Sequence, residues 1–145
     1  MQAKILLIGQ APSRTGDPNT PLLGRLGNKI TSICGLTESE YRRQFDRRNV
    51  LPKWPGRNGK GDAFPLNEAR KRARRMLPDI TSRRVIFIGK NSARAFGFKA
   101  NFLTWQTFAN NRAAILPHPS GINRWWNDPK NRRRAGRFMK SAART

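Results

Sequence analysis

The chain has 145 residues and carries 30 lysines and arginines against 8 aspartates and glutamates, which gives a net charge of +22. A chain of this length can bury a substantial core, and we expect residues 1–145 to form a single domain. Self-repulsion at this charge destabilises a compact chain, so a polyanionic partner is the simplest explanation for it. A solvated, highly soluble surface is the alternative interpretation.

The sequence also excludes several classes of protein. It has no apolar stretch near the roughly 20 residues of a membrane span, and the run Ile5–Ile8 is too short for the core of a signal peptide. We therefore expect a monomeric cytoplasmic protein with no membrane partner, nucleoid-associated or, for a viral chain, in the host cytoplasm. One cysteine and one histidine exclude an intramolecular disulfide and leave too few ligands for a conventional metal site, so we expect no metal and no cofactor.

Apolar spacing and capping signals predict the elements of the first half of the chain. A short apolar run that ends at Gly9 is typical of a buried strand. Thr37 and Glu40 have the spacing of a capping box, which marks the start of a helix. The expected elements are a strand over 4–9, a loop over 14–20, a helix over 22–34, a helix from Thr37 to about Arg47, and a short strand over 49–51.

The second half alternates in the same way. Residues 52–65 are rich in proline, glycine and cations, which is typical of a surface loop. Asp128 and Pro129 form a good N-cap and first-turn pair for a last helix. The expected elements are a helix over 67–76 capped by Asn67, a strand over 84–89, a short helix over 92–96, a strand over 113–116 and a helix over 130–143; residues 104–108 are left open.

Strands that alternate with helices, and that are continuous apolar runs, are typical of a parallel sheet covered on both faces. We therefore expect an α/β fold, a three-layer α/β/α sandwich with a central, mostly parallel sheet of about four strands. Two polar segments directly follow apolar strands: GQAPS at 9–13 and HPSGINR at 118–124. Ligands bind beyond the carboxyl ends of strands in such sheets, so both segments are expected to face one pocket.

The order of these segments resembles the uracil-DNA glycosylase superfamily, and most closely its compact, bacterial-type branch. Gly9–Pro12 resembles the first motif of that branch, in which an acidic residue follows at about the position of Asp17. Pro21–Gly27 resembles the segment that comes next, and His118–Ser120 resembles the second motif. The resemblance spans residues 5–124, and the cysteines that bind an iron–sulfur cluster in one branch are absent.

The resemblance implies a DNA glycosylase that flips a uracil or modified pyrimidine out of double- or single-stranded DNA and hydrolyses its N-glycosidic bond. In this interpretation His118 stabilises the negative charge that develops on the departing pyrimidine. Asn49 reads the pyrimidine edge, because its amide offers both a donor and an acceptor. Asp17 is the nearest candidate to position or deprotonate water, and Gln10 orients that water.

The remaining predicted site residues contact the base or the DNA. Leu22 stands where the family usually stacks a phenylalanine on the base. Ile122 holds the position of the apolar wedge that fills the vacated space, and Arg124 is placed to hold a phosphate or the orphaned base. Ala11, Pro12 and Ser120 complete the expected base-binding group. Asn123, Lys53, Arg57 and Lys60 complete the expected DNA-binding group.

Departures from the family motifs keep a second function open. Gln10 and Ala11 stand where other members carry carboxylates, so the chain is alternatively a catalytically impaired glycosylase-fold protein that binds DNA without excising a base. A leucine at position 22 also leaves room for a larger or modified pyrimidine. Simpler interpretations remain for single residues: Asp17 stabilises a turn, Ile122 belongs to the core, and His118 merely ends a strand.

Overall fold

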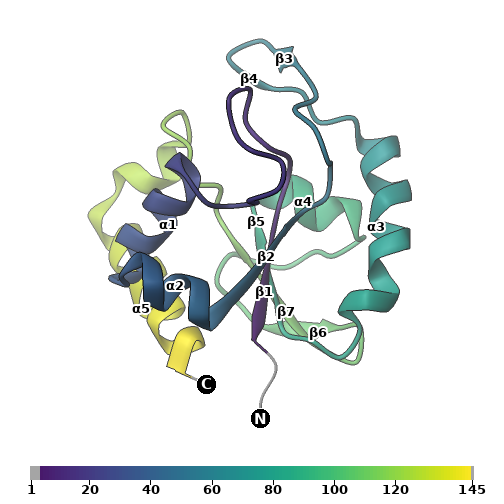
Figure 1. Ribbon diagram of the computed structural model, residues 1–145. Coiled ribbons are helices and arrows are strands. Elements are labelled where there is room, and N and C mark those ends of the chain that lie inside the picture. Colours follow the sequence, from purple (N-terminus) through teal and green to yellow (C-terminus); the bar gives the residue numbers. More distant parts are fainter. Residues whose placement is uncertain (1–3, 145) are drawn as a thin grey trace.

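The computed structural model describes residues 4–144 and contains a five-stranded sheet in the order β2-β1-β5-β7-β6 (Figure 1). Four of its strands are parallel, and β6 pairs antiparallel with β7 at one edge. The strands are β1 (Ile5–Gly9), β2 (Phe45–Asn49), β5 (Val85–Ile88), β6 (Gln106–Phe108) and β7 (Asn111–Leu116). The expected three-layer, mostly parallel architecture is confirmed, with one strand more than predicted.

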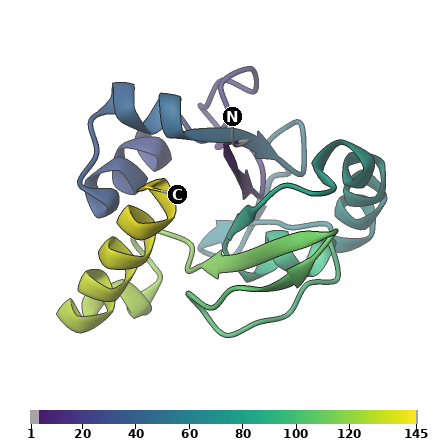
Figure 2. The same ribbon diagram turned by 90° about the horizontal axis from the view of Figure 1, so that it is seen from below.

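Helices cover both faces of the sheet because alternate strand residues point to opposite sides (Figure 2). Leu6 and Ile8 share a cluster with α3 and α4, whereas Ile5 and Leu7 share one with α1, α2 and α5. The helices are α1 (Arg25–Cys34), α2 (Glu38–Gln44), α3 (Leu66–Ile80), α4 (Lys90–Ala95) and α5 (Pro129–Arg144), and a 3-10 helix η1 (Arg124–Asn127) precedes α5. No helix of the described residues is long and apolar enough to cross a bilayer.

The extra strand comes from the segment that the sequence left open. Residues 106–108 turn back onto β7 through Ala109 and Asn110, which have φ values of 47° and 64°. Positive φ at both central residues is the geometry of a two-residue hairpin whose twist matches the strands. The sequence signal was weak because alanine rarely occupies such a position.

Several expected boundaries were wrong. The second expected helix ends at Gln44, and residues 45–49 form β2 in place of a strand over 49–51. This strand, FDRRN, lies at the edge of the sheet, where polar side chains reach solvent. It therefore lacks the apolar run that marks a central strand in the sequence. The capping box at Thr37 is confirmed: its Oγ1 accepts from the Glu40 N–H at 3.1 Å.

Two further boundaries differ around the basic loop. Helix α3 is capped by Pro65 without a side-chain hydrogen bond and continues past the expected end at Met76, with Pro78 in its last turn. Within the expected loop the chain forms a small antiparallel hairpin, β3 (Arg57–Asn58) with β4 (Gly61–Asp62). Apolar spacing does not predict strands of two residues, because they are shorter than one repeat of the pattern. It also does not predict that a helix continues through a proline in its last turn.

Helix α1 begins three residues later than expected because Leu22 leaves helical geometry with φ of 57°. The buried Tyr41 hydroxyl of α2 donates to the Leu22 carbonyl at 2.9 Å, which ties this turn to the helical layer. A non-glycine residue in the left-handed region is unfavourable, so the surrounding contacts must hold it there. The turn places the Leu22 side chain over Gly9 at the end of β1.

We predict that Tyr41→Phe lowers the free energy of unfolding by about 1–3 kcal/mol, because it leaves a buried carbonyl without a donor while the ring still packs. Urea unfolding of both proteins measures the difference. Phe102→Leu, which changes a half-buried ring elsewhere, serves as a packing control that leaves this hydrogen bond intact. Equal stability of Tyr41→Phe and the parent would contradict a stabilising role for the bond.

Candidate active site

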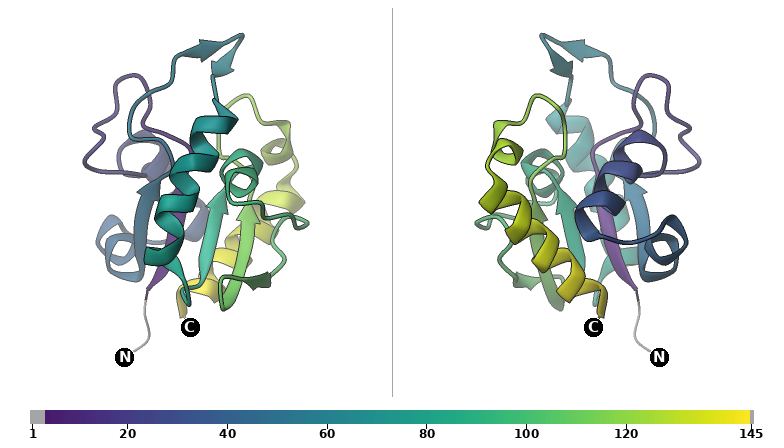
Figure 3. Two further views of the ribbon diagram at one scale, coloured as in Figure 1. Left: turned by 90° about the vertical axis from the view of Figure 1, so that its right-hand side faces the viewer. Right: turned by 90° about the vertical axis from the view of Figure 1, so that its left-hand side faces the viewer.

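Three segments from distant parts of the sequence gather beyond the carboxyl edge of the sheet (Figure 3). They are the loop after β1, the β3-β4 hairpin and the loop after β7. The chain leaves β1 towards α1 on one face and leaves the adjacent β5 towards α4 on the other face. Such a reversal between neighbouring parallel strands opens a crevice at their ends, which is where ligands bind in open α/β sheets.

A cavity of about 750 Å³ lies at this edge. It brings together residues of all three segments with Asn49 at the end of β2. Among the predicted site residues, those that line it are Ala11, Pro12, Asp17, Leu22, Asn49, Arg57, His118 and Ser120. Its volume falls in the range of about 300–1,000 Å³ that is typical of small-molecule sites, so a nucleobase fits within it.

His118 is held firmly in this cavity. Its carbonyl accepts hydrogen bonds from Ser120 N, Asn123 Nδ2 and Trp126 Nε1, each at 2.9 Å. Its side chain lies over Gly89 at the end of β5, where an added Cβ would lie 3.2 Å from His118 Cβ. The Gln10 amide nitrogen lies over the same glycine, 3.5 Å from that position, so Gln10 and His118 meet there although Gln10 does not line the cavity.

Burial lowers the pKa of the His118 imidazole below its usual value, because a charged ring is poorly solvated there. The carboxylate of Asp62 opposes this change, and the ammonium of Lys29 reinforces it. Histidine is therefore neutral at pH 7, which leaves one ring N–H to donate a hydrogen bond. A neutral donor of this kind can stabilise an oxyanion without carrying a buried charge.

Asn49 is placed by the pairing of β2 with β1, which sets it opposite Gly9. Its Oδ1 is buried without a hydrogen-bond partner. An added Cβ at Gly9 would lie 2.6 Å from that oxygen and 2.7 Å from Leu22 Cδ2, so glycine is needed for this close approach. An unpaired buried acceptor is costly, and such groups in native structures often face a ligand.

Asp17 is used in a turn. Its Oδ1 accepts from the Asn19 N–H at 2.9 Å, and its carbonyl accepts from the Thr20 N–H at 3.2 Å. The side chain is exposed at the rim of the cavity. The turn-stabilising interpretation of this residue therefore has direct geometric support, while its catalytic role stays a prediction.

A second carboxylate, which the sequence analysis did not predict as a site residue, also lines the cavity. Asp62 comes from the β3-β4 hairpin, and its Oδ1 accepts from Trp54 Nε1 at 3.0 Å. This bond holds one oxygen of an otherwise exposed carboxylate. The signal that would have found it is Asn58-Gly59, since this dipeptide favours a tight hairpin and so predicts that the chain doubles back towards the site.

The predicted DNA-binding residues lie in two segments, the chain from Lys53 to the β3-β4 hairpin and the loop after His118. Ile122 is 64% exposed, which rules out its interpretation as a core residue, and its Cδ1 lies 3.7 Å from a Cβ position at Gly61 of the hairpin. Asn123 uses both polar atoms of its side chain within the loop, to His118 O and Trp125 N. Arg124, Lys53, Arg57 and Lys60 are exposed, and of these only Arg57 lines the cavity.

We predict that two charge-removing variants move the pKa of His118 in opposite directions. Asp62→Asn removes the charge that raises this pKa and so lowers it further, whereas Lys29→Met removes the charge that lowers it and so raises it. NMR titration of the imidazole protons measures both directly, because the chain has a single histidine. Asp79→Asn on α3 is the control, and a shift of the same sign in the first two variants would contradict the assignment.

The comparisons with known proteins agree with this architecture. A search of curated proteins gave no match. The family model of the uracil DNA glycosylase superfamily matches residues 1–140, nearly the whole chain, and the mostly parallel sheet flanked by helices is the fold expected for it. The chain therefore belongs to the uracil DNA glycosylase superfamily, and this membership indicates a hydrolase of the DNA glycosylase kind that acts on DNA.

Proposed function

We propose that the protein excises a uracil or modified pyrimidine that has been flipped out of DNA into the cavity at the ends of β1, β2 and β7. The observation that carries the proposal is that Asn49 and His118 line the same base-sized cavity, and that the buried Oδ1 of Asn49 has no hydrogen-bond partner. The net charge of +22 supports binding to the phosphate backbone, and the exposed Ile122 supplies an apolar wedge for the vacated space.

In the reaction, the bond between C1′ of the deoxyribose and N1 of the pyrimidine breaks, and its electron pair passes to the ring and its O2. The N–H of neutral His118 donates to that oxygen as the charge develops. A rotation of the Asn49 amide lets Oδ1 accept from the pyrimidine N3–H while the amide nitrogen donates to O4. Water then adds to C1′ and loses a proton, which leaves an abasic site and the free base.

Asp62 is our candidate for the group that orients this water and accepts its proton. The first loop carries Gln10 and Ala11 and so supplies no carboxylate at that point. Asp17 is committed to its turn, whereas Asp62 is anchored by Trp54 and interacts with His118 through its charge. The hairpin thereby supplies a candidate general base in place of the carboxylates that positions 10 and 11 lack.

The base preference follows from the side chain at position 22. Leu22 lines the cavity where an aromatic ring would stack flat on a uracil, and a leucine is narrower and non-planar. A ring substituent on the pyrimidine is therefore more readily accommodated. A panel of duplexes that carry uracil or 5-substituted pyrimidines compares the rates, and release of uracil alone would contradict this preference.

We predict that His118→Ala lowers the rate of base release by roughly 10²–10³-fold, because it removes the donor to the developing oxyanion. Asn49→Ala is expected to abolish or greatly reduce release as well. Alkaline cleavage of abasic sites measures the rates, and fluorescence anisotropy checks that DNA binding is mostly retained. Full activity of both variants would overturn the assignment, and strong salt-dependent binding by the parent without base release would favour a DNA-binding role instead.

We predict that Asp62→Asn lowers the rate of release by about 10²-fold or more, with little change in DNA affinity, since a general base acts only on the chemical step. Asp17→Asn is the matched control at the rim of the same cavity. A larger loss of activity in Asp17→Asn than in Asp62→Asn would return the catalytic role to the first loop.

A further inference from the structure

A second hollow of about 710 Å³ lies beside the cavity, between α1, η1 and α5. In Figure 1 these helices lie together on one side of the sheet. Their approach is close, because a Cβ at Gly136 of α5 would lie 3.0 Å from Ile33 O of α1. We call this hollow the α1–α5 groove; its lining residues are Gly24, Arg25, Asn28, Lys29, Ser32, Ile33, Pro119, Ser120, Trp126 and Arg132.

The α1–α5 groove is continuous with the cavity. Both hollows are lined by Arg25 and Lys29, which stand one helical turn apart on α1, and by Pro119 and Ser120 directly after His118. A strand that places one base in the cavity can therefore continue into the groove without leaving the protein surface.

The charges of the groove favour a polyanion. Arg25, Lys29 and Arg132 contribute three cations, and its lining in the described part of the chain includes no acidic side chain. All three residues are exposed, so their charged ends can reach a bound phosphate. Phosphates that bind such cations release counterions, which gives a salt-dependent affinity.

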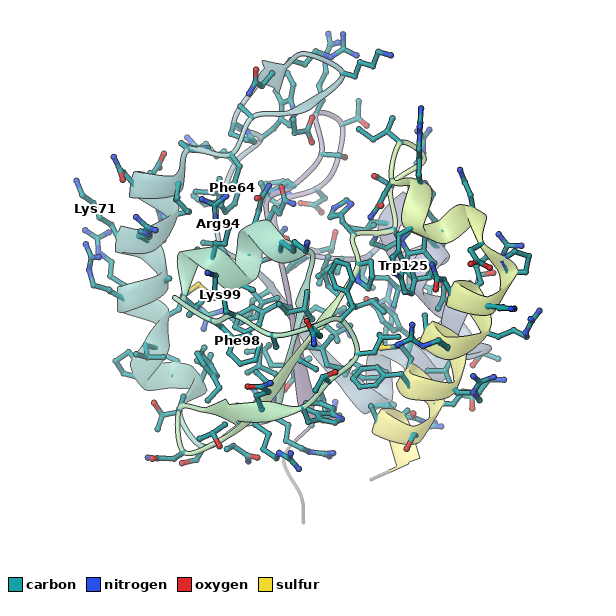
Figure 4. The ribbon with its side chains drawn as sticks, turned by 180° about the vertical axis from the view of Figure 1, so that it is seen from behind. Phe64, Lys71, Arg94, Phe98, Lys99 and Trp125 are labelled. Carbon is teal, nitrogen blue, oxygen red and sulfur yellow. The ribbon has the colours of Figure 1, made fainter. Side chains whose placement is uncertain are left out.

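The floor of the groove is apolar and fixed. Trp126 donates its Nε1 hydrogen to His118 O at 2.9 Å and meets Trp125 edge to face, with ring centroids 4.7 Å apart. Trp125 lies on the α5 side of the sheet, opposite to Lys71 of α3 (Figure 4). With Ile33 and Pro119, the anchored Trp126 provides a surface against which a base can stack.

We propose that the α1–α5 groove binds single-stranded DNA, holding the nucleotides next to the one whose base enters the cavity. Cations beside a fixed aromatic ring are the combination that binds an unpaired strand, through phosphates and base faces together. A groove of this volume has room for one or two nucleotides, and its aromatic ring can stack only on a base that is not already stacked inside a duplex. The inference rests on the proposed function, because it assumes that a base of the same strand enters the cavity, but binding measurements alone can test it.

The test uses variants that add a negative charge to the groove without touching the cavity. Ser32→Glu and Asn28→Asp change residues that line only the groove. Ser39→Glu on α2 and Asn101→Asp are matched controls at exposed positions outside both hollows. Fluorescence anisotropy compares their affinities for an eight-nucleotide oligodeoxyadenylate, an eight-base-pair duplex of guanine and cytosine, and deoxyadenosine monophosphate, none of which contains uracil or a 5-substituted pyrimidine.

We expect each groove variant to bind the single strand roughly tenfold more weakly, because the added carboxylate repels the phosphates held there, while duplex affinity and the controls change little. Equal losses for single strand and duplex, or equal losses in the control variants, would overturn the proposal. Tight binding of deoxyadenosine monophosphate, with no gain for the oligonucleotide, would assign the groove to a free nucleotide and overturn the proposal too. Because no base is released, the outcome is independent of whether the protein is an active glycosylase.

Discussion

Close backbone approach at two glycines is the constraint on which the candidate site depends. Gly89 directly follows β5 with φ of 93°, and His118 and Gln10 lie over it. Gly9 ends the neighbouring strand β1 and is covered in the same way by Asn49 and Leu22. At Gly9 a side chain would have to displace the Asn49 Oδ1, which lies 2.6 Å from the Cβ position. At Gly89 the positive φ is the stronger requirement for glycine, because His118 and Gln10 would need to move little.

The electrostatics of the molecule combine two opposite requirements. The surface carries a large positive charge that attracts phosphates, whereas the histidine must stay neutral to act as a donor within the same field. Burial of the imidazole and the charge of Lys29 both favour the neutral ring, and Asp62 limits how far its pKa falls. The surface charge that favours DNA binding thus also favours the protonation state that the proposed chemistry needs.

Much of this arrangement could be predicted from the chain itself. Central strands are recognisable because both of their faces are buried, so β1, β5 and β7 appear as apolar runs, and the polar segments after β1 and β7 were correctly expected to meet. The edge strand β2 was expected only over 49–51, and the hairpin that carries Asp62 was missed, because neither buries two faces. The unfavourable φ of Leu22 depends on a hydrogen bond from Tyr41, 19 residues away, and no local pattern encodes such a contact.

The polar edge strand has a consequence for how copies of the protein meet. Strand β2 exposes an edge flanked by Asp46, Arg47 and Arg48, and the opposite edge is the three-residue β6. Charged or very short edges resist the addition of a strand from another molecule. A protein that gathers at high local density along a DNA polyanion loses the protection of its own charge repulsion there. The sheet edges then provide the barrier to aggregation that net charge provides in free solution.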